Sequence, residues 1–307
     1  MNLKRLLSPV SLAVACAWFA TAIAPATAQQ PAAPPQSTAA GKGPPDQPKI
    51  LSDGAAIIPG AHQFLLRDEN SGREYLVRVA EPAKQSPAGT KPPVIYVLDG
   101  NWYFGLATDI ARMLPIGTST PPAYVVAIGY ADSNFDSVVA NREHDLMYGH
   151  FADRPEVGGG GAAFQSFLTG ELRSFIERRY EVDPDRAYLA GQSLGGQFTA
   201  AVLLNDPDAF AGYLIGSPSL WANGDIMPAA QRFTQGAGRR VMIGTGAAES
   251  PGMRDGAAAL AAALSRPETG LAVSTRFFEN QHHMSMQGPW FAEGLRFLMD
   301  GATGGIR

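Results

Sequence analysis

The amino-acid sequence predicts an α/β protein: a mostly parallel central sheet with helices on both faces and an antiparallel hairpin at its N-terminal side. Three observations indicate this fold. The runs 93–98 and 123–130 are continuously apolar and rich in β-branched residues, which is typical of strands covered on both faces. Segments of helical length alternate with such runs, as in parallel sheets. Finally, Asp185–Leu204 combines a short strand, a sharp Gly-x-Ser-x-Gly turn and an apolar helix.

The first fifty residues differ in composition from the rest of the chain. Residues 1–28 have a basic start, a long apolar run and a final Ala-Thr-Ala, which predicts a secretory signal cleaved after Ala28 and a periplasmic or secreted protein. Because the apolar run is long, an N-terminal membrane anchor is the alternative. Residues 29–50 are rich in Pro, Ala and Gln, which predicts a disordered linker. Residues 51–307 are then expected to form one α/β domain.

Composition excludes several classes of partner and cofactor. The single cysteine, Cys16, lies in the predicted signal, so the mature chain is expected to have no disulfide, thiol nucleophile or cysteine-bound metal. A net charge of −4 and a pI of about 5.7, without any basic cluster, argue against nucleic acid. We therefore expect a small-molecule ligand, no metal, no cofactor and no stable membrane insertion after cleavage. The sequence leaves the oligomeric state open.

Taken in chain order, strand and helix patterns fill most of the predicted domain. Two strand-like runs flank Asn70-Ser71-Gly72, a turn signal, and so predict a hairpin. Residues 132–161 are polar and glycine-rich without clear periodicity, which predicts a long functional or mobile loop. The expected strands are 62–67, 74–79, 93–98, 123–130, 187–190, 212–216, 240–243 and 272–278, and the expected helices are 102–114, 162–180, 194–204, 253–264 and 289–299.

Ser193 is the predicted nucleophile. Gly191 and Gly195 flank it at two residues on either side, where a Cβ would collide with the neighbouring strand or helix. The serine itself is held in a strained conformation, and such strain persists where it serves a site. The alternative is an ordinary glycine-rich turn with an idle serine.

A serine hydroxyl needs a base within hydrogen-bond reach, oriented by a third group. Only two histidines follow the serine, the adjacent pair His282 and His283, so the base is one of these two. In chains with such an elbow the acid lies between serine and histidine. Glu249 is the best candidate because it follows a late strand. The next candidates are Asp225 and Asp255.

Attack on an ester carbonyl also requires donors for the negative charge that develops on oxygen. One donor is expected to be the backbone N–H of Leu194, directly after the nucleophile. The second should come from the loop after the strand that ends at Leu98, from Gly100 or Asn101. The alternative for this loop is a simple turn.

With these residues in place, the chain resembles the putative-esterase family of α/β-hydrolases, and within it the siderophore esterases that act on enterobactin, salmochelin and bacillibactin. The similarity spans roughly residues 63–298. The stretches that carry it are VLDGNW at 97–102, REHDL at 142–146, FLTGELRSFIERRY at 167–180, LAGQSLGG at 189–196 and SPSLW at 217–221; GTGAAE at 244–249 and HHMSM at 282–286 match less closely.

This resemblance implies an α/β-hydrolase fold and a serine esterase that works through an acyl-enzyme, plausibly on siderophore trilactones or related esters. It selects His283 as the base, because the family's histidine is followed two residues later by a serine, and Asn101 as the second oxyanion donor. Its carboxylate position varies, so a Ser–His pair without Glu249 is the alternative. Arg142 is expected either to face the substrate or to pair with Asp145.

Trp102 and Trp221, which lie in the VLDGNW and SPSLW stretches, are further candidate substrate contacts. A catalytically silent binding protein on the hydrolase scaffold is the main alternative function, because a fold does not determine an activity. An acyltransferase, a general carboxylesterase and a peptidase are the other candidates.

Overall fold

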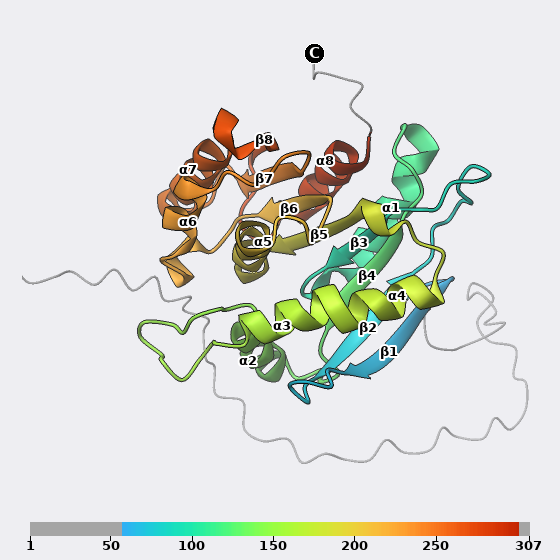
Figure 1. Cartoon of the computed structure of the whole chain (residues 1–307), viewed down its shortest axis with the longest axis horizontal. Coiled ribbons are helices and arrows are strands. Elements are labelled where there is room, and N and C mark those ends of the chain that lie inside the picture. The colour runs from blue at the N-terminus through green and yellow to red at the C-terminus, as the bar shows by residue number, and fades with distance from the viewer. Residues whose placement is uncertain (1–56, 301–307) are drawn as a thin grey trace, which may run out of the picture. The chain divides into compact units, whose positions relative to one another are not determined.

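A computed structural model describes residues 57–300 of the chain (Figure 1). The predicted signal peptide, Cys16 and the linker at 29–50 lie outside the described residues. The predicted domain boundaries therefore remain predictions. Within 57–300, no helix has the length and apolar character needed to cross a membrane.

Eight strands form one sheet in the order β1-β2-β4-β3-β5-β6-β7-β8. From β4 to β8 along this order all neighbours are parallel, whereas β2 is antiparallel to both β1 and β4. The parallel sheet and the N-terminal hairpin predicted from the sequence are thereby confirmed. The strands are β1 (Ala61–Arg67), β2 (Glu74–Ala80), β3 (Val94–Val97), β4 (Tyr124–Gly129), β5 (Ala187–Gln192), β6 (Gly212–Gly216), β7 (Arg240–Gly246) and β8 (Ala272–Phe278).

Helices cover both faces of the sheet, because the buried strands present apolar side chains alternately to either side. Tyr96 packs in the cluster with α3 to α7, whereas its neighbour Ile95 packs in the cluster with α1 and α8. Figure 1 shows the α3–α4 segment crossing in front of the strands. The helices are α1 (Gly100–Gly117), α2 (Phe135–Asp145), α3 (Gly161–Phe167), α4 (Arg173–Arg179), α5 (Leu194–Asn205), α6 (Ile226–Arg232), α7 (Pro251–Leu264) and α8 (Gln287–Met299).

The predicted loop at 132–161 contains a helix, α2, so that expectation was wrong in part. The sequence shows no apolar stripe there because α2 buries only Val138 and Asp145. Its start is set locally, since the Asn134 side chain accepts a hydrogen bond from the backbone N–H of Ser137 at 3.1 Å. Its remaining support is polar: the Asn141 side chain accepts a 2.7 Å bond from Arg73.

The predicted helix at 162–180 is continuous, but its middle is a π-turn over Leu168–Leu172 that joins α3 to α4. A π-turn inserts one residue into the helix and rotates the faces on either side of it. Phe167 and Leu172 are nevertheless both buried, so both halves keep an apolar face toward the sheet.

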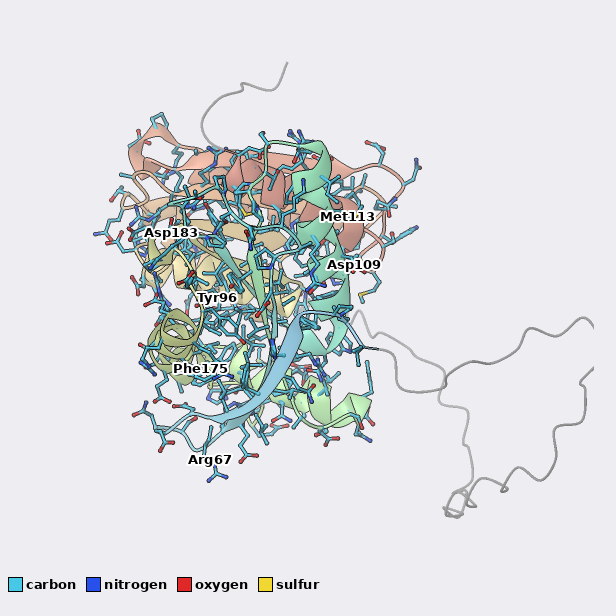
Figure 2. All side chains as sticks on the ribbon, turned by 90° about the vertical axis from the view of Figure 1, so that its right-hand side faces the viewer. Arg67, Tyr96, Asp109, Met113, Phe175 and Asp183 are labelled. Atoms are coloured by element: carbon cyan, nitrogen blue, oxygen red, sulfur yellow. The ribbon has the colours of Figure 1, made fainter. Side chains whose placement is uncertain are left out.

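Some large core side chains pack directly against strand glycines, where a Cβ atom would leave no room. Figure 2 shows Tyr96 among the packed side chains in the middle of the domain, whereas Asp109 and Met113 lie on α1. Trp290 of α8 is fully buried. A Cβ on Gly244 would lie 2.5 Å from the Cδ1 atom of Trp290, and one on Gly216 would lie 2.8 Å from its Cε2. The two glycines thus make room for the indole ring, which lets α8 pack closely on β6 and β7.

We expect Gly244→Ala to destabilise the protein by about 1–3 kcal/mol, because the added methyl group overpacks a rigid site. The matched control is Gly105→Ala in α1, where no atom lies within 4 Å of the added Cβ. Gly105→Ala should leave the free energy of unfolding at the wild-type value or raise it by up to about 1 kcal/mol. Urea unfolding of both variants measures the effect, and equal stability of the two would contradict this account of the packing.

Candidate active site

The predicted site residues gather at one edge of the sheet, where the parallel strands end. Asp99 follows β3, Ser193 follows β5, Glu249 follows β7 and His283 follows β8. The carboxyl ends of parallel strands meet at the same edge, which is where ligands bind in open α/β sheets. The chain therefore brings residues nearly two hundred positions apart to one place.

Ser193 sits at a tight, strained turn between β5 and α5. Its backbone has φ 61° and ψ −119°, a region that non-glycine residues rarely occupy. A Cβ on Gly191 would lie 2.3 Å from the backbone oxygen of Gly195, so only glycine fits there. The Ser193 side chain is half-buried, and its Oγ lies 3.2 Å from Oγ of Ser219.

Glu249 and His283 form a hydrogen-bonded pair in which the carboxylate is buried and the imidazole is half-buried. The Nδ1 atom of His283 lies 2.7 Å from Oε2 of Glu249, whose side chain is 2 % exposed. The other carboxylate oxygen, Oε1, accepts hydrogen bonds from the Ser217 hydroxyl, from the Thr245 hydroxyl at 3.1 Å and from the Gly246 N–H at 2.8 Å. Four donors thus surround this carboxylate, three at Oε1 and one at Oε2, and a buried charge requires such partners.

The balance of these contacts favours the ionised carboxylate. Burial works to raise the pKa of Glu249, but the bonds from His283, Ser217 and Gly246 outweigh it and hold the pKa below its ordinary value of 4.5. An ionised carboxylate only accepts hydrogen bonds. Nδ1 of His283 must therefore carry the proton, which leaves Nε2 as an acceptor in the neutral ring.

The side-chain amide of Gln192 contacts this Nε2 atom. Its amide nitrogen lies 3.2 Å from Nε2 of His283 and donates to the His283 backbone oxygen at 3.1 Å. The Tyr103 hydroxyl in turn donates to Oε1 of Gln192 at 3.0 Å. Burial, followed by the Asp99 charge, raises the pKa of Tyr103 to about 12, so this hydroxyl keeps its proton at neutral pH. No hydrogen bond joins Ser193 to His283 among residues 57–300.

The other candidates for base and acid lie apart from this pair. His282 is exposed, and its backbone N–H donates to Ser285 at 2.9 Å. Asp225 and Asp255 are exposed at the starts of α6 and α7. The geometry therefore joins His283 and Glu249, and among residues 57–300 no side-chain hydrogen bond or ion pair links His282, Asp225 or Asp255 to either of them.

The predicted oxyanion loop begins α1. Asp99 has a left-handed conformation, with φ 55°, and the backbone N–H groups of Asn101 and Leu194 have no acceptor among the described residues. Sequence reasoning missed the role of the Asn101 side chain, whose Oδ1 accepts from the Tyr130 N–H at 2.8 Å and whose amide donates to the Tyr130 oxygen at 2.9 Å. This clamp requires Gly129, because a Cβ there would lie 2.2 Å from Oδ1 of Asn101.

Arg142 pairs with Asp99 and not with Asp145, so the predicted alternative partner was wrong. Two guanidinium nitrogens of Arg142 each donate to an Asp99 carboxylate oxygen at 2.8 Å, and both side chains are buried. Burial acts to lower the pKa of Arg142, but the Asp99 charge and hydrogen bonds raise it overall. Asp145 instead pairs with Arg73 and with His144, each at 2.8 Å.

The edge of the site carries exposed aromatic rings. Trp102 is 38 % exposed and lies 5.9 Å from the Phe135 ring, with the Arg142 guanidinium 5.4 Å from its centroid. Trp221 is 70 % exposed and lies 6.1 Å from Phe151. Substrate contacts by Arg142, Trp102 and Trp221 remain predictions.

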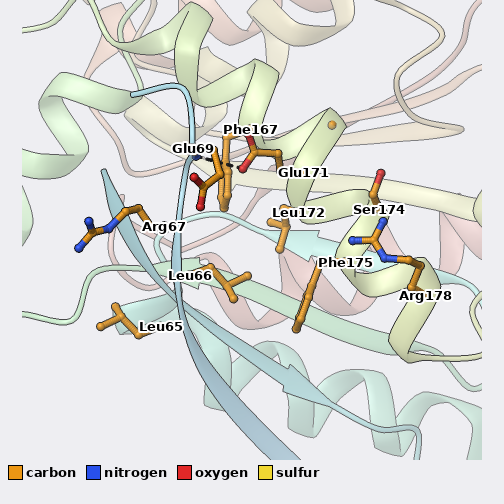
Figure 3. Close-up of a pocket in the computed structure, with 11 residues that line it drawn as sticks. Leu65, Leu66, Arg67, Glu69, Phe167, Glu171, Leu172, Ser174, Phe175 and Arg178 are labelled. Atoms are coloured by element: carbon orange, nitrogen blue, oxygen red, sulfur yellow. Dashed lines mark hydrogen bonds between the residues drawn. The ribbon is translucent and has the colours of Figure 1, made fainter. Parts of the chain in front are cut away.

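A separate hollow of about 790 Å³ lies between β1 and the α3–α4 segment (Figure 3). Leu65, Phe175 and Arg178 line it, and the carboxylate of Glu171 accepts hydrogen bonds from the backbone N–H of Glu69 at 3.2 Å and from Asn70. It is lined by none of the predicted site residues. Among residues 57–300, no group of three or more His, Cys, Asp or Glu side chains could hold a metal ion.

Comparison with known proteins agrees with this architecture. Residues 69–290 match the protein family described as "Putative esterase". The ferri-bacillibactin esterase BesA of Bacillus subtilis is 30 % identical over 265 residues, which cover 80 % of this chain and 91 % of that protein. The siderophore enterobactin esterase of Emericella nidulans is 32 % identical over 206 residues, covering 59 % of this chain and 66 % of that protein.

Solved structures show the same fold. The BES protein of Bacillus cereus superposes with a TM-score of 0.73 at 26 % identity, covering 81 % of this chain and 98 % of that one. The siderophore hydrolase EstB of Aspergillus nidulans superposes with a TM-score of 0.69 at 26 % identity, covering 83 % and 100 %. The α/β-hydrolase fold expected from the sequence is thereby confirmed.

The Glu249–His283 pair makes stability depend on pH. Since the folded-state pKa of Glu249 lies below its ordinary value of 4.5, its ionised form stabilises the fold above that pH, and the contribution is lost as the pH falls through the folded-state value. We therefore expect Glu249→Gln to lower the free energy of unfolding at pH 7 and to cost progressively less below about pH 4.5.

Urea unfolding at several pH values measures this effect, with Glu279→Gln as the control because Glu279 is an exposed carboxylate in the same region. The control should change stability little at any pH. A Glu249→Gln cost that is the same at pH 7 and pH 3.5 would show that the carboxylate charge does not contribute.

Proposed function

Because this chain belongs to the putative-esterase family of α/β-hydrolases, we propose that it is a serine-dependent carboxylic ester hydrolase that acts through an acyl-enzyme. One observation carries the serine-dependent part. Ser193 stands on a strained elbow directly after Gln192, and the Gln192 side chain contacts the ring of His283, which is held by Glu249. Nucleophile, base and orienting acid thus lie at the same strand ends.

The reaction would proceed in two steps, acylation of Ser193 and hydrolysis of the acyl-enzyme. In acylation, the Gln192 amide leaves Nε2 of His283, and the Ser193 hydroxyl points its proton at that nitrogen while Oγ stays beside Ser219. Oγ then bonds to the ester carbonyl carbon as the proton passes to Nε2. The imidazolium then gives this proton to the leaving alcohol. In deacylation, water loses a proton to Nε2, bonds to the acyl carbon and displaces Ser193, which recovers a proton from His283.

Three further groups would lower the barrier, namely two backbone N–H donors and the Glu249 carboxylate. The free N–H groups of Asn101 and Leu194 would donate to the carbonyl oxygen as it becomes negative, and such donors typically contribute 10²–10³ in rate each. Glu249 would stabilise the imidazolium and keep the proton on Nδ1, so that Nε2 faces the reacting atoms. The Asn101 side-chain clamp holds its own N–H in place.

Siderophore trilactones or related esters are the proposed substrate class, because relatives over most of this chain are named as siderophore esterases. The exposed rings of Trp102, at the start of α1, and of Trp221, in the SPSLW segment, offer flat apolar surfaces. The sequence pattern of residues 1–28 supports a mature protein that acts outside the cytoplasm. A silent binding protein, a general carboxylesterase and an acyltransferase are the competing functions.

We expect Ser193→Ala to reduce hydrolysis of p-nitrophenyl butyrate by at least about 10³-fold, because the proposed acyl-enzyme forms on the Ser193 hydroxyl. Initial rates of p-nitrophenolate release measure this loss. If the wild type is no more active than this variant, the protein is a silent binder and the proposal fails.

The two histidines provide a matched control in this assay. His283→Ala should approach the loss seen for Ser193→Ala, and His282→Ala should keep activity near wild type because its side chain is exposed and contacts neither Ser193 nor Glu249 in the described structure. The opposite result would assign the base to His282.

For the substrate class, we expect kcat/KM for catecholate trilactones, with and without ferric iron, to exceed kcat/KM for p-nitrophenyl butyrate by at least about tenfold, since remote binding energy raises kcat/KM for the cognate ester. Chromatography of the released monomers measures the rates. A preference for simple alkyl esters would indicate a general carboxylesterase, and acyl transfer to an added alcohol in place of hydrolysis would indicate an acyltransferase.

A further inference from the structure

The turn after β6, which we name the SPS turn (Ser217–Pro218–Ser219), contacts both the proposed nucleophile Ser193 and the proposed acid Glu249. The Ser219 hydroxyl lies 3.2 Å from Oγ of Ser193. The Ser217 hydroxyl donates to Oε1 of Glu249. Both serines are buried, Ser217 at 0 % and Ser219 at 3 % exposure, so their hydroxyls interact with protein groups and not with bulk solvent.

The SPS turn is held rigidly against the elbow. The Ser217 N–H donates to the Gly244 oxygen at 2.7 Å and the Ser219 N–H donates to the Ser193 oxygen at 3.1 Å. Ser217 has φ 35°, a strained value for a residue with a Cβ. Gly196 makes the close approach possible, because a Cβ there would lie 2.4 Å from the Gly216 oxygen and 3.2 Å from the Pro218 Cα.

From this geometry we infer that the SPS turn supplies two further functional hydroxyls: Ser219 as a catalytic residue that donates to Oγ of Ser193, and Ser217 as a positioning residue that orients Glu249. The inference rests on the proposed esterase function and deepens it. It gives roles to two serines that lie within the SPSLW stretch but that sequence reasoning did not single out.

Ser219 is suited to stabilise the attacking oxygen. When Ser193 passes its proton to His283, its Oγ gains negative charge and can only accept hydrogen bonds. Ser219 has no other side-chain partner within the described residues, so its O–H is free to point at that oxygen. It keeps its own proton throughout: the Ser193 O–H bond breaks toward His283, and the same contact serves again when Oγ leaves the acyl carbon in deacylation.

Ser217 is suited to hold the acid. Oε1 of Glu249 takes its bonds from Ser217, Thr245 and Gly246, which leaves Oε2 for Nδ1 of His283. Two donors come from the chain around β7 itself, whereas Ser217 comes from the neighbouring strand end. Without the Ser217 hydroxyl, Oε1 of Glu249 keeps donors from β7 alone. The carboxylate can then rotate away from the imidazole of His283.

The test compares Ser219→Ala and Ser217→Ala with Ser174→Ala, an exposed serine on α4 that serves as the matched control. For each variant, kcat and KM for p-nitrophenyl butyrate are measured together with the rate constant of inactivation by diisopropyl fluorophosphate, which reports attack by Ser193 alone. Urea unfolding identifies any variant that is not folded at the assay temperature.

We expect Ser219→Ala to lower both kcat and the inactivation rate constant about tenfold with KM unchanged. This loss is smaller than the 10²–10³ typical of an oxyanion donor because the attacking oxygen carries only part of the charge. Wild-type rate constants, a change in KM alone, or faster inactivation would overturn the role of Ser219. If Ser219→Ala does not fold, Ser219→Cys keeps the size with a weaker donor and should give a smaller loss in the same two rate constants.

For Ser217→Ala we expect a loss of about tenfold in kcat in the wild-type background and no further loss when Glu249→Gln is already present, because the hydroxyl acts through that carboxylate. An equal loss in both backgrounds would show a merely structural role and overturn the assignment. Failure of the esterase proposal looks different, since wild type and Ser193→Ala would then be equally inactive.

Discussion

Gly191 and Gly196 let the backbone bend so closely at Ser193 that a Cβ on Gly191 would lie 2.3 Å from the Gly195 oxygen. The bend is bonded to the neighbouring strand end, because the Ser193 N–H donates to the Gly216 oxygen at 2.9 Å and its carbonyl accepts from Ser219. Strain at such a turn costs about 1–3 kcal/mol and is held by what surrounds it. Here α5 is buried along residues 194–203, so the helix that leaves the turn secures it.

The second support of the site is the buried pair of Asp99 and Arg142. The bidentate contact ties α2 to the start of α1, where the backbone N–H of Asn101 lies. Such a pair adds little net stability, but removing one partner leaves a buried charge and typically costs about 3–5 kcal/mol. The pair therefore acts less as a source of stability than as a constraint that fixes the loop beside the nucleophile, while its Arg142 guanidinium also lies near the Trp102 ring.

Local patterns in the sequence were enough for the elements with strong periodicity. The apolar runs of β3 and β4, the hairpin of β1 and β2, and the elbow at Ser193 each carry their own signal and occur where expected. The helix α2 carries no such signal, because it buries only Val138 and Asp145 and is held by polar contacts to residues far away in the chain. Periodicity reports burial of an apolar face, so a helix without one cannot be predicted in this way.

The sequence by itself determined the parallel sheet, the elbow, and a short set of candidates: one serine, two histidines and three acids. Chain order and residue type suffice for these, since both are local properties. Chain position and the family resemblance favoured Glu249 and His283, but only the tertiary structure brought the two together as a pair, gave Asp99 to Arg142, and placed Ser217 and Ser219 between acid and nucleophile. Each of these contacts joins residues from different strand ends, and their distance depends on strand order and register, which no single stretch of the chain encodes.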